Sequence, residues 1–201
     1  MARRTGRRPG NPDTRETILD AAREAFAERG YDAASIRAIA TRAGVDPALV
    51  HHYFGTKEQL FVAVMQLPVN PAEILKGVAE GRRDEAGERL ARAFLTVWDS
   101  PAGTAAAAVL RSAVNNEWGA RMVREFVTRQ ILRRVMQQLD LAHEPDAALR
   151  AALAGSQLIG LAMARYIIKL EPIASAPRET LVAAVAPTIQ RYLTGDVTLD
   201  A

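Results

Sequence analysis

The sequence predicts an all-α protein with a small N-terminal domain of three helices, including a helix-turn-helix, and a larger C-terminal helical domain. Three observations lead to this fold class. Apolar residues recur at helical spacing along most of the chain, and no stretch alternates as a strand would. Residues 35–61 carry the capping residues and glycines that delimit short helices. The run Leu67-Pro68-Val69-Asn70-Pro71 breaks the pattern, so we expect domains over 11–66 and 67–201.

The composition is that of an ordinary soluble protein, with 49% hydrophobic and 24% charged residues. Cysteine is absent, which excludes disulfides and cysteine-based zinc sites. No signal peptide is recognisable, and no apolar run approaches the ~20 residues that a membrane span needs. We therefore expect a cytoplasmic protein without a membrane partner or a cofactor.

Residues 1–10 are expected to form a flexible basic arm. Four arginines precede the first acidic residue, Asp13, and the arm's glycines and proline disfavour a helix. The arm can be a solvated tail, or it can contact the phosphate backbone or the minor groove of DNA. These candidate DNA-binding residues are Arg3, Arg4, Arg7 and Arg8.

The first helix is predicted from Pro12 to Arg29, with Gly30 as its C-cap. Its apolar stripe consists of Ile18, Leu19, Ala22, Ala25 and Phe26. The second helix begins at Ser35, a favourable N-cap residue, and ends at Gly44.

The third helix opens with Asp46-Pro47, an N-cap followed by proline at the first helical position. Val50 and Phe54 are expected to face inward, with part of Tyr53, and Gly55 ends the helix. Thr56-Lys57-Glu58-Gln59 is a capping box for a fourth helix. The outward side of the third helix is then Ala48, Leu49, His51 and His52.

Two short helices joined by a tight glycine turn predict a helix-turn-helix, whose second helix lies in the DNA major groove. At the start of the first of these helices, the hydroxyl and backbone amides of Ser35 can hold a phosphate or simply cap the helix.

Residues 12–65 resemble the tetracycline-repressor family of bacterial transcriptional regulators. The resemblance rests on Ile18-Leu19-Asp20-Ala21-Ala22, Phe26-Ala27-Glu28-Arg29-Gly30-Tyr31, Ser35-Ile36-Arg37-Ala38-Ile39-Ala40, Ala43-Gly44-Val45 and His52-Tyr53-Phe54-Gly55-Thr56-Lys57-Glu58-Gln59-Leu60-Phe61. It implies that Arg37 reaches a base edge, although a solvated surface arginine is an open alternative. It also implies base-facing roles for Pro47, Ala48, Leu49 and His52, and phosphate contacts for His51, Tyr53 and Lys57.

The adjacent histidines His51 and His52 do not predict a metal site, because neighbours on a helix point about 100° apart. Both are close to neutral at pH 7 and can donate hydrogen bonds with little added charge. We therefore expect DNA binding to be tighter at pH 6 than at pH 8.

Beyond the boundary the chain stays helical, and it carries no catalytic motif, so we do not expect an enzyme. The predicted helices are 72–80, 85–99, 102–116, 119–140, 146–169 and 178–193. They are separated by breaks at Gly81, Ser100-Pro101, Trp118-Gly119, His143-Glu144-Pro145 and the loop 172–177.

The resemblance implies that this second domain dimerises and binds a small molecule. One short recognition helix reads few bases, so such proteins use two half-sites, which favours a homodimer on a palindromic operator. The last two long helices are the candidates for the interface, and an intramolecular core is the alternative. The interface candidates are Leu149, Ala152, Leu153, Ser156, Gly160, Leu181, Val182, Val185 and Ile189.

Wide apolar residues with polar neighbours are candidates for lining a ligand cavity, and the few aromatic residues favour an aliphatic or amphipathic ligand. An ordinary helical core is the alternative for each of them. The candidates are Phe94, Trp98, Leu110, Val114, Asn115, Met122, Phe126, Ile159, Met163 and Tyr166.

The resemblance implies a homodimeric repressor that a small-molecule ligand releases from double-stranded DNA, with ligand and DNA weakening each other by one shared coupling free energy. The alternatives are an activator, a regulator without a ligand, and an architectural DNA-binding protein with little sequence preference.

Overall fold

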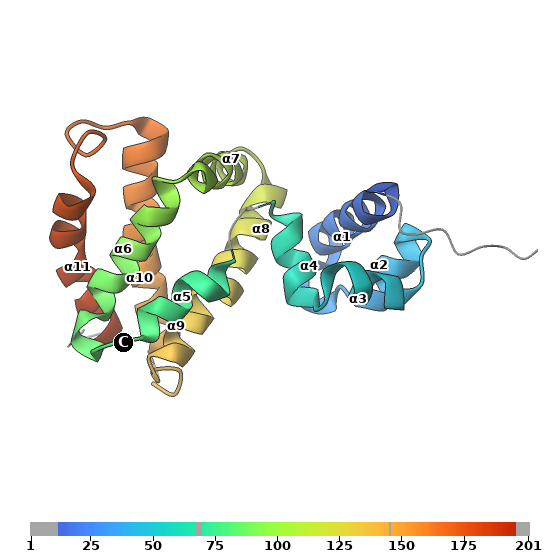
Figure 1. The fold of residues 1–201 in the computed structure, drawn as a ribbon, viewed down its shortest axis with the longest axis horizontal. Coiled ribbons are helices and arrows are strands. Elements are labelled where there is room, and N and C mark those ends of the chain that lie inside the picture. The colour runs from blue at the N-terminus through green and yellow to red at the C-terminus, as the bar shows by residue number, and fades with distance from the viewer. Residues whose placement is uncertain (1–11, 67–69, 145, 196–201) are drawn as a thin grey trace, which may run out of the picture. The chain divides into compact units, whose positions relative to one another are not determined.

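The computed structural model describes residues 12–66, 70–144 and 146–195. The chain divides into two compact units, Met1–Gln66 and Leu67–Ala201. Within the described residues the secondary structure is helical, with no strand, which confirms the all-α fold class (Figure 1).

The first unit consists of four helices around a small aromatic core. The ring of Phe61 meets those of Phe26 and Tyr31 edge-on, at centroid distances of 5.0 and 5.2 Å. Gly30, with a φ of 74°, interrupts the first helical run, as its predicted role as a C-cap requires. The helices are α1 (Pro12–Ala33), α2 (Ile36–Ala43), α3 (Pro47–Phe54) and α4 (Lys57–Val64).

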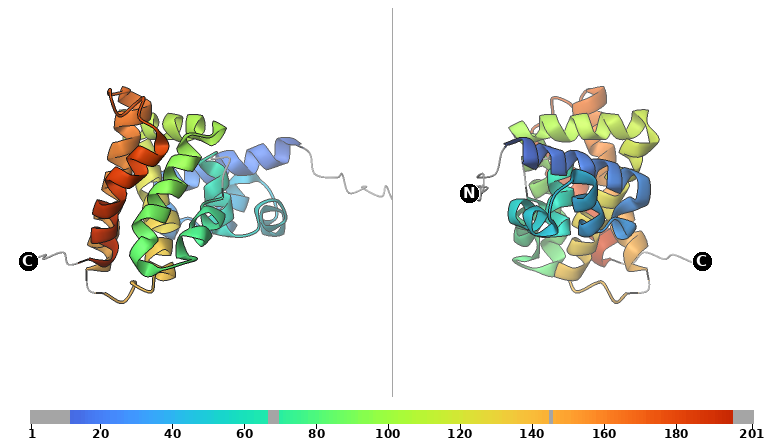
Figure 2. Two further views of the ribbon diagram at one scale, coloured as in Figure 1. Left: turned by 60° about the vertical axis from the view of Figure 1, so that its left-hand side comes forward. Right: turned by 90° about the vertical axis from the view of Figure 1, so that its right-hand side faces the viewer.

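The second unit is a larger helical bundle. In it α10 and α11 run alongside each other, and α11 also packs along α6 (Figure 2). Its elements are α5 (Pro71–Ala79), the 3₁₀ turn η1 (Arg83–Glu85), α6 (Ala86–Trp98), α7 (Pro101–Asn115), α8 (Glu117–Phe126), the π-helical segment η2 (Val127–Leu132), α9 (Arg133–Gln138), α10 (Ala147–Ala162), the π-helical segment η3 (Met163–Ile168) and α11 (Arg178–Thr194).

The predicted break at Trp118-Gly119 is wrong, because Asn116 is the residue that separates α7 from α8. Its side-chain oxygen accepts a hydrogen bond from the amide of Gly119 at 2.6 Å and so caps α8. The two longest predicted helices also change character along their length. The first contains η2 in its middle, and the second ends in η3.

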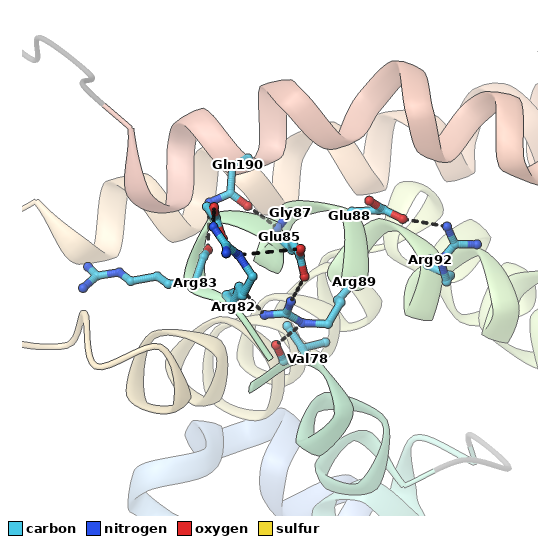
Figure 3. Close-up of polar contacts among 10 residues, drawn as sticks. Val78, Arg82, Arg83, Glu85, Gly87, Glu88, Arg89, Arg92 and Gln190 are labelled. Carbon is cyan, nitrogen blue, oxygen red and sulfur yellow. Dashed lines mark hydrogen bonds and ion pairs between the residues drawn. The ribbon is translucent and has the colours of Figure 1, made fainter. Parts of the chain in front are cut away.

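A glycine allows α6 and α11 to approach closely. The amide of Gly87 donates a hydrogen bond of 2.7 Å to Gln190 Oε1, and Gln190 Nε2 donates one of 3.0 Å to the carbonyl of Arg83 (Figure 3). Nearby, Arg89 donates to the carbonyls of Val78 and Arg82, at 2.9 and 2.7 Å. These bonds join the end of α5, η1 and the start of α6 to α11.

The expectation that no apolar stretch approaches the length of a membrane span is wrong for the helical run formed by α10 and η3. By length and composition alone, Ala147–Ile168 is able to cross a membrane, because its most apolar 18 residues have a mean hydropathy of 1.4. Of these residues, 33% are buried inside the protein. Core helices of helical proteins pass the same test. This helix packs Ala151, Ala154 and Leu158 into the core of the second unit.

Candidate nucleic-acid interface

The turn between α2 and α3 is fixed by its capping residues. Ser35 caps α2 through a hydrogen bond of 3.1 Å from the amide of Ala38 to its hydroxyl. Gly44 ends α2 with a φ of 67°, a left-handed conformation that glycine adopts without strain. The amide of Val45 then donates to the carbonyl of Ala40 at 3.0 Å, closing a Schellman-type turn. The helix-turn-helix predicted from the sequence is thus confirmed in its local geometry.

The recognition helix α3 begins where the sequence predicts. Asp46 accepts a hydrogen bond of 2.7 Å from the amide of Ala48, and Pro47 occupies the first turn. Val50 and Phe54 are buried, which fixes one side of the helix against the unit. The opposite side presents Ala48, His51 and His52 as exposed residues, with Leu49 and Pro47 partly exposed.

Two arginines that the sequence analysis did not single out link the helices of the first unit to one another. Arg42 of α2 pairs with Glu28 and Glu24 of α1, at 2.6 and 3.6 Å, and its hydrogen bond lowers the pKa of Glu28. Arg15 of α1 lies over the ring of Phe54 of α3, at 5.1 Å from the centroid. No local pattern marks such pairs, because their partners lie on another helix.

Arg37 is exposed on the first turn of α2, and no described residue pairs with its guanidinium, so the side chain is free to reach a ligand.

Tyr53 differs from its expected role. Its hydroxyl oxygen is buried and has no hydrogen-bond partner among the described residues, so in this conformation it does not face solvent. A phosphate contact by Tyr53 would therefore require its ring to move. The arm residues Arg3, Arg4, Arg7 and Arg8 lie outside the described residues.

The geometry of His51 defines which of its nitrogens can meet DNA. Its Nδ1 lies 2.8 Å from the carbonyl oxygen of Gly55. A carbonyl only accepts, so Nδ1 carries the proton and Nε2 of the neutral ring is an acceptor. The neutral His51 ring therefore cannot donate a hydrogen bond to a phosphate through Nε2, contrary to the expectation from the sequence. Only a doubly protonated ring carries a donor at Nε2.

Lys57 lies at the start of α4, and its ammonium group contacts both a backbone carbonyl and an aromatic ring. Its Nζ donates to the carbonyl of Asp32 at 3.2 Å and lies 4.5 Å from the centroid of the Tyr31 ring. These contacts stabilise the unit whether or not DNA is bound. A phosphate contact by Lys57 remains a prediction.

Replacing Lys57 with alanine should weaken binding to all DNA sequences alike. The slope of log affinity against log salt should fall by about 1 per lost phosphate contact. The Lys57→Arg variant keeps the charge and should keep the slope. A lowered melting temperature with an unchanged slope would show that Lys57 serves only the fold.

The candidate ligand residues are distributed unevenly in the second unit. Phe94, Trp98 and Tyr166 come together, with centroids 5.6 and 5.2 Å apart in succession. Tyr166 donates to Asp99 at 2.8 Å, and burial raises the pKa of Tyr166 to about 12, so the phenol stays protonated. Met122 and Phe126 are buried, and the partly buried candidates are Leu110, Ile159 and Met163.

Two ligand candidates and three interface candidates do not suit their expected roles. Val114 is 69% exposed and Asn115 is also exposed, and both lie in the last turn of α7. Leu181, Val182 and Ile189 are 8%, 1% and 0% exposed within one protomer. They pack into its own core, so they leave almost no surface for a second copy.

Four of the remaining interface candidates lie on one face of α10. Leu149 is 49% exposed, and Ala152, Ser156 and Gly160 are exposed at intervals of three and four residues. Leu153 and Val185 are partly exposed. Among the residues that the structure describes, no group of three His, Cys, Asp or Glu side chains could hold a metal ion.

Comparison with known protein families gives two matches. Residues 18–64 match the family described as "Bacterial regulatory proteins, tetR family". Residues 84–193, more than half of the chain, match "Tetracyclin repressor-like, C-terminal domain".

Individual relatives agree with these matches. A TetR-family regulator of known structure from Streptomyces coelicolor A3 is 40% identical, with 94% of this chain and 98% of that chain covered and a TM-score of 0.48. The transcriptional repressor Rv3405c of Mycobacterium tuberculosis is 42% identical over 92 residues, 43% of this chain and 49% of that protein. The transcriptional activator FasR of Mycolicibacterium smegmatis is 36% identical over 86 residues, 43% of this chain and 38% of that protein. The chain spans less than half the length of the curated relatives it matches.

Proposed function

The chain belongs to the tetracycline-repressor family of DNA-binding transcriptional regulators, which are not enzymes, and from this premise we propose that it is a homodimeric repressor acting in the cytoplasm. In this proposal two copies of α3 read a palindromic operator, and a small molecule bound in the second unit releases the protein from it. The observation that carries the DNA-binding part is the exposed side of α3, presented on a helix whose other side is buried.

The proposed dimer rests on the exposed face of α10. Leu149, Ala152, Ser156 and Gly160 form one stripe, and small residues allow two helices to approach closely. An apolar stripe that the protomer leaves uncovered favours contact with another protein surface. A C2 axis would place the same stripe of a second copy against it.

Replacing Ala152 with glutamate should dissociate the dimer, because each interface would then bring two unpaired charges into apolar contact. Sedimentation equilibrium should show a monomer, and operator affinity should fall by on the order of 100-fold because one half-site alone is read. The Ala142→Glu variant adds the same charge to an exposed residue of the loop after α9 and should remain dimeric. A variant Ala152→Glu that stays dimeric would place the interface elsewhere.

Two directions of regulation are open for this protein, repression and activation of its target genes. Among the relatives, one is named a repressor and another an activator. We favour repression, and a reporter gene behind the selected operator tests it. Expression should fall when the protein is supplied, whereas a rise would identify an activator.

A further inference from the structure

His51 of α3 is joined to Gly55, the residue that ends the helix, through both its ring and its backbone. Its Nδ1 lies 2.8 Å from the carbonyl oxygen of Gly55, and its own carbonyl accepts a hydrogen bond of 2.8 Å from the amide of Gly55. The first contact makes Nδ1 the protonated nitrogen of the neutral ring, because a carbonyl oxygen only accepts. The other ring nitrogen, Nε2, is then left as an acceptor with a lone pair.

The position of the Gly55 carbonyl is itself set by the start of α4. Gly55 has a φ of 70° and a ψ of −106°, a backbone conformation that favours glycine. The capping box follows directly: the amide of Thr56 donates to Gln59 Oε1 at 2.9 Å, and the amide of Gln59 donates to Thr56 Oγ1 at 3.2 Å. A β-carbon on Gly55 would collide with Gln59 Oε1. The carbonyl that holds the His51 ring therefore belongs to a closed, hydrogen-bonded turn.

His51 shares the exposed face of α3 with the residues that are expected to enter the major groove. Ala48 and His51 are both exposed and lie three residues apart, and Pro47, four residues before His51, is partly exposed. In a helix-turn-helix, residues near the N-terminus of the recognition helix contact base edges. His51 lies one turn further along the same face, so its ring is placed to meet the edge of a base.

An acceptor at Nε2 restricts what the neutral His51 ring can bind. A phosphate group offers oxygen acceptors, so this ring gains no hydrogen bond from it. In the major groove the donors are the N6 amino group of adenine and the N4 amino group of cytosine, whereas guanine and thymine present acceptors. An exocyclic amino group is therefore the complementary partner.

We propose that His51 is a specificity-determining residue, whose Nε2 accepts a hydrogen bond from the exocyclic amino group of an adenine or a cytosine in each half-site. The inference rests on the proposed reading of an operator, and it names the base chemistry that one residue reads. It replaces the phosphate contact that the family resemblance implies for His51.

Parallel selection of binding sites from random duplex DNA, with the full-length wild type and two variants, tests the proposal. The wild type should recover a consensus with an adenine or a cytosine at a position whose preference depends on His51. His51→Ala has no acceptor, so it should lose the preference at that position and keep it at the others. His51→Arg presents only donors and should change the preference there to guanine, the base that arginine most often contacts.

The matched control is His143→Arg, which makes the same substitution at an exposed residue of the second unit. It should select the wild-type consensus.

A second measurement removes the amino group from the DNA and leaves the wild-type protein intact, so it does not depend on the folding of a variant. In the consensus duplex, purine replaces the adenine, or 2-pyrimidinone replaces the cytosine, at the position assigned to His51. Fluorescence anisotropy should show that wild-type affinity falls roughly tenfold. The affinity of His51→Ala should be the same for the modified and unmodified duplexes.

Two results would overturn this inference alone. One is a uniform loss of affinity in His51→Ala with the preference unchanged at every position, which would assign His51 to a phosphate. The other is a wild-type affinity that does not respond to removal of the amino group. Either result leaves a sequence-specific regulator intact. If the wild type recovers no consensus, the proposed function fails and this inference fails with it.

Discussion

Replacing Gly87 with alanine should destabilise the second unit by about 3 kcal/mol, an overpacking effect at the upper end of the usual range. A β-carbon at this position would lie 2.6 Å from both the carbonyl oxygen of Ala186 and the amide nitrogen of Gln190. Both atoms belong to the backbone of α11, so no side-chain rotation relieves the clash. Helices α6 and α11 would have to separate, and the hydrogen bond from Gly87 to Gln190 would lengthen (Figure 3).

The measurement is thermal and urea unfolding, and the expected fall in melting temperature is roughly 10 °C. Gly77 of α5 supplies the matched control, because a β-carbon there meets nothing within 4 Å. Gly77→Ala should therefore gain about 0.5–1 kcal/mol from helix propensity. A Gly87→Ala variant as stable as Gly77→Ala would contradict the close approach of α6 and α11.

Replacing Ala48 with glutamate should reduce operator affinity by on the order of 100-fold, since like-charge contacts at an interface cost several kcal/mol. Ala48 is exposed near the start of α3, the end expected to enter the major groove. A carboxylate there would face the phosphates on both sides of the groove. The melting temperature should hold or rise slightly, because an acid in the first turn suits the helix dipole.

The control for charge alone is Gln138→Glu, which changes the net charge equally on an exposed residue of the other unit. Its affinity should stay within about threefold of the wild type. If Ala48→Glu binds as well as this control, α3 does not lie in the groove as proposed.

The DNA-reading unit could be predicted from the sequence because its signals are local. Ser35, Asp46 and Thr56 each cap the helix that follows, and Gly44 and Gly55 each adopt a positive φ at the end of a helix. A short polar side chain or a glycine performs these roles within a few residues of its own position, so residue type and spacing suffice.

The second unit was less predictable because its decisive contacts join distant residues. The stripe containing Leu181, Val182 and Ile189 indicates a buried face, but periodicity does not say whether the same chain or a second copy covers it. The structure assigns it to the protomer's own core. The π-helical segment η2 was not predicted either, because no residue type marks the change from i+4 to i+5 hydrogen bonds within a helix.

Selection of binding sites from random duplex DNA with the purified protein tests the central claim most directly. A dimeric reader with α3 in the groove should recover a palindromic consensus whose half-sites lie about one helical turn apart. Binding that depends strongly on salt but yields no consensus would contradict a sequence-specific regulator and favour an architectural DNA-binding protein.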